Sequence, residues 1–543
     1  MTMFPTRSVL TACVPAVLVA LGLALAPASA RARQVQAPET GTPPVTMTVD
    51  EAIQIALVNN HAILRSRLDV ATASAQVKEG WGQLLPQVEL SSSYTRNLKS
   101  ANPFSGSQAG NLFNSLGFVD WLAFNEQART DDDPGTQPIS LAEFFTRRQA
   151  GLDAAGAVLS GGDNPFSVPN QFNATLSITQ KLFDGRALFG ATGADKYLEP
   201  FQERRLARAE QLLIAQVKQA FYRALLARSR AEVAAQSVTR MRATLDEMTR
   251  RVAQGLAPKF DRLSTEVELA NLETQLIQAR NAAAQADDNL RLLLGMPAGQ
   301  PIELRGSLEA SDPDAFFQIG LDNALELALE RRPDLEAAWY NVELSKVQEK
   351  ATKALFLPRL DAFATISYIG NVPDNRQVIL SDPNDPFSFT ARQNGFFSDN
   401  YWDWNVNVGF RLSWSLFSGF QTRQQVQQQK IARTQAELQY DELALQVKTE
   451  VEQALRDLEA ARQRIAAQRQ NVARAELNYT YAQARLKEGV ASPLQVREAS
   501  EQLDQSRLNY LQALHDLLVA RTAFEAAVGL PDAGLSEFQL TRK

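Results

Sequence analysis

The sequence predicts a mainly helical chain with amphipathic membrane strands, built from one structural unit that occurs twice. Three observations support this prediction: matching segments recur, long stretches lack proline, and shorter segments alternate between apolar and polar residues. The segments that end at Pro86 and Pro358 lie 272 residues apart. The glycine-containing turns that follow are 234 residues apart, pairing Gly185 with Gly419, Gly255 with Gly489 and Gly295 with Gly529. The 38-residue difference falls between the proline and the first of these glycines, so the helical part keeps a fixed length.

The N-terminus predicts export from the cytoplasm. A basic residue is followed by an apolar run, residues 9–26, and by an Ala-x-Ala site ending at Ala30. We therefore expect residues 1–30 to be a signal peptide. The single cysteine, Cys13, lies inside it, which leaves the mature chain without thiol chemistry. The formal net charge of −6 argues against a general nucleic-acid binder.

Each repeat is expected to open with helices. Residues 31–47 are rich in proline and polar residues and are predicted to be a flexible tail. Thr48 and Glu51 form a capping box for a short helix that ends near residue 59. A longer helix over about 62–85 is ended by the proline that follows it, and its counterpart in the second repeat covers about 334–357.

Four segments then alternate with a period of two residues. They cover about 87–98, 171–183, 359–370 and 404–417, which is the length and pattern of membrane β-strands. A soluble antiparallel sheet would alternate in the same way. The export signal, the long helices and aromatic residues near the strand ends favour the membrane; those aromatic residues are Tyr94, Phe172, Tyr368, Trp402, Trp404 and Trp414. Because no later stretch approaches the ~20 apolar residues of a spanning helix, any membrane entry must use strands.

Two helical stretches of about 68 residues follow the strands, and at 1.5 Å per residue each would measure roughly 100 Å. The first contains Pro200, which predicts either a kink or an imperfect start. Each stretch ends in a glycine turn, over residues 254–259 and 488–493, and a shorter helix returns from it over about 260–295 or 494–528. Ser492, Pro493 and Gln495 are typical of a helix start.

The remaining boundaries follow from these elements. Repeat 1 covers 48–297, a linker 298–320, repeat 2 321–531 and a C-terminal tail 532–543. An insertion over 99–170 separates the first two strands, and part of it, 141–159, is compatible with a short helix. Topology predicts that this insertion lies outside the cell, as a plug, as a binding site or with no specific role. Four strands cannot close a membrane barrel, whereas three copies would supply twelve and leave a passage.

These features resemble those of the TolC-like outer membrane efflux proteins, also called outer membrane factors, over about residues 46–531. The resemblance implies a fold that is mainly α with membrane β: a homotrimer with a twelve-strand outer-membrane β-barrel, four strands per protomer, and a long periplasmic α-helical barrel. It implies a Gram-negative outer-membrane protein that docks a periplasmic adaptor and an inner-membrane transporter. The implied function is a passive exit duct for small molecules such as drugs; the alternative is type I protein secretion.

The resemblance also implies a site at the two glycine turns. In the family these turns contact the adaptor, which here points to Gly255 and Leu256 in the first turn and to Gly489 and Val490 in the second. The glycines have a plainer explanation, because tight turns at helix ends also favour glycine.

Family members place acids that constrict the tunnel just after these turns. The matching positions here are Asp261, Gln495 and Glu498, and the family's basic gate position is Ala491, which puts a salt-bridge latch in doubt. Acids in the first turn of a helix are also favoured by the helix macrodipole alone.

No catalytic site is predicted. His61 and His515 stand alone on helices, and the sequence has no metal-binding cluster, phosphate loop or nucleophile elbow. We therefore expect neither enzymatic activity nor a cofactor. The competing hypothesis from another class is a non-conducting coiled-coil protein that spans the periplasm, which leaves the amphipathic strands unexplained.

Overall fold

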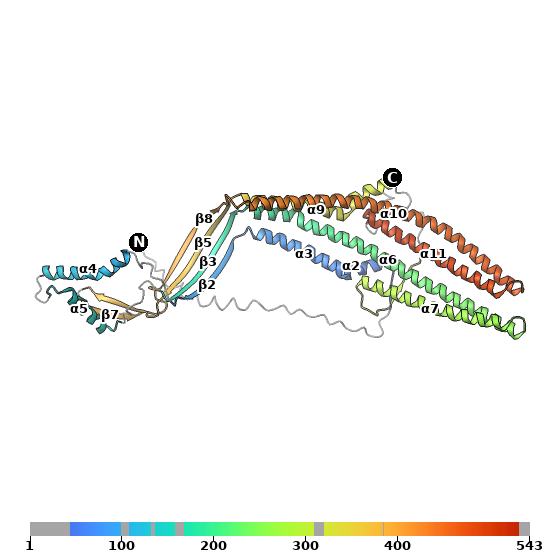
Figure 1. The fold of residues 1–543 in the computed structure, drawn as a ribbon, viewed down its shortest axis with the longest axis horizontal. Helices are drawn as coiled ribbons and strands as arrows, with labels where there is room; N and C mark the ends of the chain where they lie inside the picture. Colours follow the sequence, from blue (N-terminus) through green and yellow to red (C-terminus); the bar gives the residue numbers. More distant parts are fainter. Residues whose placement is uncertain are drawn as a thin grey trace, which may run out of the picture. The chain divides into compact units, whose positions relative to one another are not determined.

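The computed structural model describes residues 44–98, 108–131, 136–157, 168–308, 320–383 and 385–530. Its helices and strands follow the predicted order (Figure 1). The predicted signal peptide and C-terminal tail lie outside the described residues. The chain divides into two compact units, one formed by residues 1–59, 217–310 and 472–515 and the other by 60–216, 311–471 and 516–543. Across the described ranges, no helix has the combination of length and hydropathy that a membrane crossing requires.

The first unit contains the tips of two helical hairpins. α6 (Gly185–Ala253) and α7 (Lys259–Leu294) form one, and α10 (Gln421–Lys487) and α11 (Pro493–Val528) form the other, with the hairpin ends in this unit. The long helices thus have nearly the predicted bounds, and α6 continues through Pro200 without a break.

The first unit also holds α2 (Val49–Asn59) and a short parallel pair, β1 (Val45–Met47) with β4 (Ile302–Leu304). The prediction of a flexible tail is wrong for Val45–Met47, and the predicted linker contains a strand. Met47 is fully buried, so burial of this side chain together with the ladder hydrogen bonds orders both segments.

The second unit begins with α3 (His61–Gly82), whose first turn is capped by the side chain of Asn60. In the second repeat α8 (Leu321–Arg331) is the counterpart of α2, and α9 (Pro333–Lys353), followed by a single 3₁₀ turn, Ala354–Phe356, is the counterpart of α3. Pro333 opens α9 because its missing N–H is not needed at a first helical position.

Four antiparallel strands form the main sheet of the second unit, in the order β2 (Gln87–Arg96), β3 (Asn170–Phe183), β5 (Arg359–Val372) and β8 (Trp402–Ser413) (Figure 1). The bounds of β2 and β3 agree with the prediction within two residues. β8 begins two residues earlier than predicted and ends before Trp414, whose indole donates to the carbonyl of Phe356 at 3.0 Å and lies beyond the ladder.

The two faces of this sheet differ in chemistry. On β8 the even-numbered residues from position 404 onward are apolar and 57–77% exposed: Trp404, Val406, Val408, Phe410 and Leu412. The odd-numbered side chains belong to the other face, where Thr175 and Ser367 hydrogen-bond across strands at 3.0 Å. The predicted alternation is confirmed, and the apolar side chains of β8 from Trp404 to Leu412 are exposed in the described chain.

The insertion is a folded part of the second unit. It contains α4 (Gln108–Thr130) and α5 (Leu141–Ala154), and β6 (Gln377–Asp382) and β7 (Asp385–Gln393) come from the region between β5 and β8. Phe124 and Phe144 both pack edge to face on Phe387, with ring centroids 5.2 and 5.4 Å apart. The sequence predicted only the helix near 141–159, so α4 and the β6–β7 hairpin were missed.

Both return helices end against the short helix of their own repeat. Gly295 after α7 has a positive φ, and a Cβ there would lie 2.7 Å from the carbonyl oxygen of Asn59. Gly529 after α11 also has a positive φ, and its Cβ would lie 3.2 Å from the carbonyl carbon of Arg331. The residue pairs 295/529 and 59/331 follow the two repeat spacings, so the duplication extends to this close backbone approach.

Candidate functional site at the hairpin tips

Both tip turns have the same backbone geometry. Gly255 and Gly489 have φ values of 74° and 72°, a conformation that side-chain-bearing residues rarely adopt. Each glycine lies in a Schellman motif, in which the backbone N–H of the next residue donates to the carbonyl five residues before it. Leu256 donates to the carbonyl of Arg251 at 2.8 Å, and Val490 donates to the carbonyl of Arg485 at 2.9 Å. The helix ends therefore require these glycines locally.

The apolar residue after each glycine is left exposed. In a Schellman motif this residue usually packs back on the helix it ends. In both hairpins the residue that would receive this contact is an arginine, Arg251 or Arg485. Leu256 and Val490 are therefore 72% and 67% exposed. Phe260 and Leu494, which are also equivalent in the repeat, are exposed as well. Each tip thus presents exposed apolar side chains at matching positions.

The two return helices begin differently. In α11, Ser492 and Gln495 exchange hydrogen bonds: the Ser492 N–H donates to Gln495 Oε1 at 3.2 Å, and the Gln495 N–H donates to Ser492 Oγ at 3.4 Å. The predicted capping box is therefore present, and it engages the side chain of Gln495. α7 starts at Pro258 without a side-chain cap.

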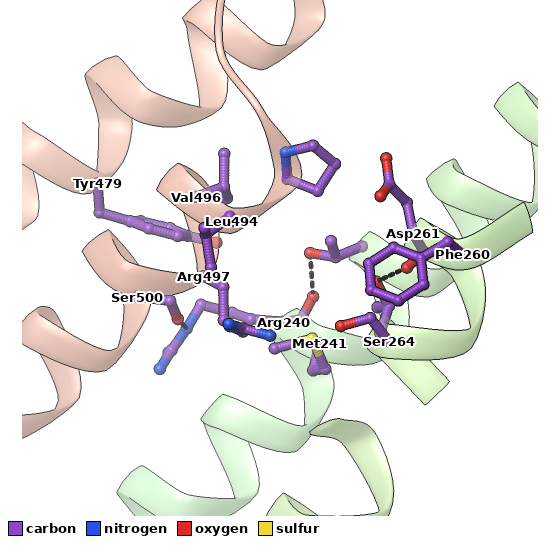
Figure 2. A pocket seen from close by; sticks show the side chains of 13 residues that line it. Arg240, Met241, Phe260, Asp261, Ser264, Tyr479, Leu494, Val496, Arg497 and Ser500 are labelled. Atoms are coloured by element: carbon purple, nitrogen blue, oxygen red, sulfur yellow. Dashed lines mark hydrogen bonds between the residues drawn. The ribbon is translucent and has the colours of Figure 1, made fainter. Parts of the chain in front are cut away.

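The first acid after each glycine turn lies at a different position in the two return helices. Asp261 is half-buried in the first turn of α7, and its equivalent in α11 is Gln495. Glu498 is exposed one turn further along α11, and its equivalent in α7 is Ser264. Among the described residues, neither carboxylate has a hydrogen bond or an ion pair, and Asp261 points away from Arg240 (Figure 2). Both acids are therefore available to ions or to a partner.

A cavity of about 300 Å³ lies between the two hairpins behind the tips (Figure 2). Asp261 is the predicted acid that lines it, while Gln495 and Glu498 are not among the lining residues. Phe260, Leu494 and Val496 contribute apolar walls. The cavity combines apolar surface with hydroxyl and guanidinium groups, so it suits an amphiphilic side chain of a partner.

A polar network missed by the sequence analysis includes Arg240 and Tyr479, which line this cavity. Arg240 of α6 pairs with Asp504 of α11, and Ser237 Oγ donates to the same carboxylate at 2.6 Å. The Arg240 guanidinium also lies 6.0 Å from the ring centroid of Tyr479 on α10. These groups join the two hairpins through charge. No sequence signal distinguishes Arg240 from the many arginines on solvated helix faces.

Within each hairpin, one ion pair occupies equivalent positions with its charges exchanged. Arg242 of α6 pairs with Glu273 of α7 at 2.6 Å. The residues 234 positions later are Glu476 of α10 and Arg507 of α11, which pair at 2.9 Å. The hairpins are therefore similar in backbone but opposite in local charge.

The chain matches the family model described as outer membrane efflux protein over residues 143–296 and 324–530. It is 26% identical over 200 residues to the alkaline protease secretion protein AprF of Pseudomonas aeruginosa, which covers 36% of this chain and 40% of that protein. It is 24% identical over 323 residues to protein CyaE of Bordetella pertussis, or 60% of each chain. The chain therefore spans less than two thirds of the length of these curated relatives.

Solved structures show a similar fold over nearly the whole chain. The Campylobacter jejuni CmeC outer membrane channel matches with a TM-score of 0.65 at 13% identity, covering 91% of this chain and 88% of that one. The predicted fold class, mainly helical with a four-stranded sheet and an internal repeat, is confirmed by this match and by the elements described above.

Proposed function

Because the chain belongs to the outer membrane efflux protein family, as its resemblance predicted, we propose that it is the passive exit duct of a tripartite export system in the outer membrane, extending into the periplasm. In this proposal the chain performs no chemistry, and an inner-membrane transporter supplies the energy.

The observation that carries the proposal is the unfinished sheet. β2 pairs only with β3 and β8 only with β5, so both edges expose unpaired backbone N–H and C=O groups in the described structure. In lipid each unsatisfied group costs several kcal/mol. The exposed apolar face of β8 suits lipid chains. Three copies joined edge to edge, β8 to β2, would satisfy these groups and enclose a passage lined by the polar face.

The tips support docking of a periplasmic adaptor. Gly255 and Gly489 hold the turns, and Leu256 and Val490 expose apolar surface that no described residue covers. A homotrimer would present six such tips, of two alternating kinds. Burial of these side chains on docking would contribute about 1–2 kcal/mol per tip at ~25 cal/mol per Å².

Asp261 and Glu498 would constrict the entrance of the tunnel and favour cations, and Gln495 would leave the second hairpin without an acid in the first turn. Their carboxylates have no partner among the described residues, which supports this role. Helix-dipole stabilisation of Asp261 is compatible with it.

Two cargo classes remain. The family description as an efflux protein supports small molecules such as drugs and toxic compounds. The match to a protein named for protease secretion supports type I protein secretion as the second candidate. Deleting the gene separates them: increased sensitivity to toxic compounds indicates small-molecule efflux, and loss of a protein from the culture medium indicates secretion.

Conductance tests the duct itself. Protein extracted from outer membranes in mild detergent should migrate as a heat-modifiable trimer and conduct ions across a planar lipid bilayer. A stable trimer that does not conduct would support the non-conducting structural protein and refute the duct.

A further inference from the structure

The polar face of the sheet carries a row of charges across three strands. In the strand register, Lys181 of β3 lies opposite Asp361 of β5, and Asp361 lies opposite Arg411 of β8. Cross-strand partners project to the same face of a sheet. Arg359 shares this face, because its Nε donates to Asp361 Oδ2 at 2.8 Å. We name Lys181, Arg359 and Arg411 the basic belt.

The basic belt and the acid beside it carry a net positive charge. Asp361 is 2% exposed, and its hydrogen bonds within the described chain come from Arg359 alone. In the same described ranges, neither Lys181 nor Arg411 forms an ion pair. The Arg411 guanidinium instead lies 5.2 Å from the ring centroid of Phe363. Three cations therefore face a single carboxylate.

The other charged side chains of this face lie away from the belt. Glu89 lies on β2 opposite Ser177, four residues along β3 from Lys181. Asp403 lies opposite Ile369 near the far end of β5. The positive charge is thus concentrated in the part of the sheet next to the helices and does not extend along the strands.

The belt lies on the face opposite the exposed apolar side chains of β8, so a sheet closed in lipid would direct it into the passage. We propose that the basic belt makes this part of the duct selective for anions and favours cargo that carries carboxylate, phosphate or sulfate groups. This inference rests on the proposed duct. In a homotrimer the belt would contain nine cations against three carboxylates. An ion would then pass the basic belt and the tip acids one after the other, and the belt would favour anions where the tip acids favour cations.

The magnitude follows from the potential of such a ring. Clustered charges of one sign in a narrow cleft create potentials of several kT, and a change of one kT alters the concentration of a monovalent ion about e-fold. We therefore expect removal of two cations per protomer to lower the ratio of chloride to potassium permeability at least about threefold. The effect should be clear at 0.1 M salt and small at 1 M, where the Debye length falls to about 3 Å.

The test compares three proteins in planar bilayers under a KCl gradient: wild type, Lys181→Gln/Arg411→Gln, and the charge-preserving control Lys181→Arg/Arg411→Lys. Each is first shown to be a heat-modifiable trimer. The glutamine variant should shift the reversal potential toward the equilibrium potential of potassium. The charge-preserving control should have the reversal potential of the wild type. Each measurement is repeated with Asp261→Asn/Glu498→Gln added, so that the tip acids do not mask the belt.

The outcomes separate this inference from the proposed function. If wild-type trimers do not conduct, the duct itself is refuted. If they conduct and the glutamine variant keeps the wild-type permeability ratio at 0.1 M in both backgrounds, the basic belt is refuted. If the double variant does not assemble, Lys181→Gln and Arg411→Gln are measured singly. Each should then shift the reversal potential by about half as much, and an unchanged reversal potential in both would refute the basic belt.

Discussion

Replacing Arg332 by methionine should loosen the second unit at one identifiable place. Arg332 precedes α9 and is 2% exposed. Its guanidinium donates to both carboxylate oxygens of Asp334, at 3.0 and 2.6 Å, to Glu450 of α10 at 2.6 Å, and to the carbonyl of Ala527 near the end of α11 at 3.3 Å. One side chain therefore joins three helices.

The expected magnitude follows from what the substitution leaves behind. Removing one partner from a buried ion pair costs about 3–5 kcal/mol, because the remaining charge stays desolvated. Glu450 is partly exposed and can be hydrated, and Arg208 lies 3.3 Å from Asp334, so we take the lower end, about 3 kcal/mol. Arg464→Met is the matched control: Arg464 is 54% exposed and pairs with Asp516 at 2.9 Å, and exposed pairs contribute about 0–1 kcal/mol.

Hydrogen exchange is the suitable assay, since a chain of this size need not unfold in one step. Amides at the end of α11 and the start of α9 should exchange about a hundredfold faster in Arg332→Met, because each 1.4 kcal/mol corresponds to a factor of ten. Arg464→Met should change exchange in the same peptides less than fivefold. Equal exchange rates in the two variants would show that the network does not hold these helices, and the reasoning would fail.

Four further predictions concern the same network and the tips. Burial alone raises the pKa of Asp334, but hydrogen bonds from Arg332 and the nearby guanidinium charges lower it below its ordinary 3.8. The ionised carboxylate should therefore stabilise the folded state fully above pH ~4, and this contribution should be lost as the pH falls further. In acid unfolding, Asp334→Asn should remove this pH dependence. Gly489→Trp should keep the trimer but abolish export in a complementation assay, whereas Gly489→Asn, which tolerates the positive φ, should retain most of it; normal export by the tryptophan variant would argue against docking at this turn. Asp261→Asn with Glu498→Gln should reduce cation selectivity in bilayers, and unchanged selectivity would exclude both from the passage. Arg240→Met should speed proteolysis at the tip turns severalfold, because Asp504 loses its charge partner; unaltered cleavage kinetics would mean that this pair does not join the hairpins.

The sequence predicted the repeated elements well because their signals are local. Proline at position 86, glycine at 255 and 489 and the alternation in the strands act through backbone geometry within a few residues. The long helices consequently end within one or two residues of their predicted limits. The short strand at Val45–Met47 was missed because its partner lies more than 250 residues away and neither segment shows a periodic pattern.

The folded insertion was missed for a similar reason. The packing of Phe124 and Phe144 on Phe387 joins loops from the two repeats, and no periodicity in either loop encodes that contact. Gly151 allows α5 to approach β7 closely, since a Cβ there would lie 1.8 Å from the carbonyl oxygen of Phe387. A glycine in mid-helix signals close packing without identifying the partner.

The candidate site was only partly predictable because duplication preserves backbone geometry more strictly than charge. Both tips have a glycine with positive φ, and most other residues there would add strain of about 1 kcal/mol or more. The ion pair Arg242–Glu273 and its counterpart Glu476–Arg507 have the same Coulomb energy in either polarity, so the fold does not fix which helix carries the cation. Groups outside each pair therefore contribute to the polarity: Arg507 also donates to Gln236 Oε1 of α6 at 3.1 Å. The differences between the two halves are therefore the positions at which mutation should change recognition without changing the fold.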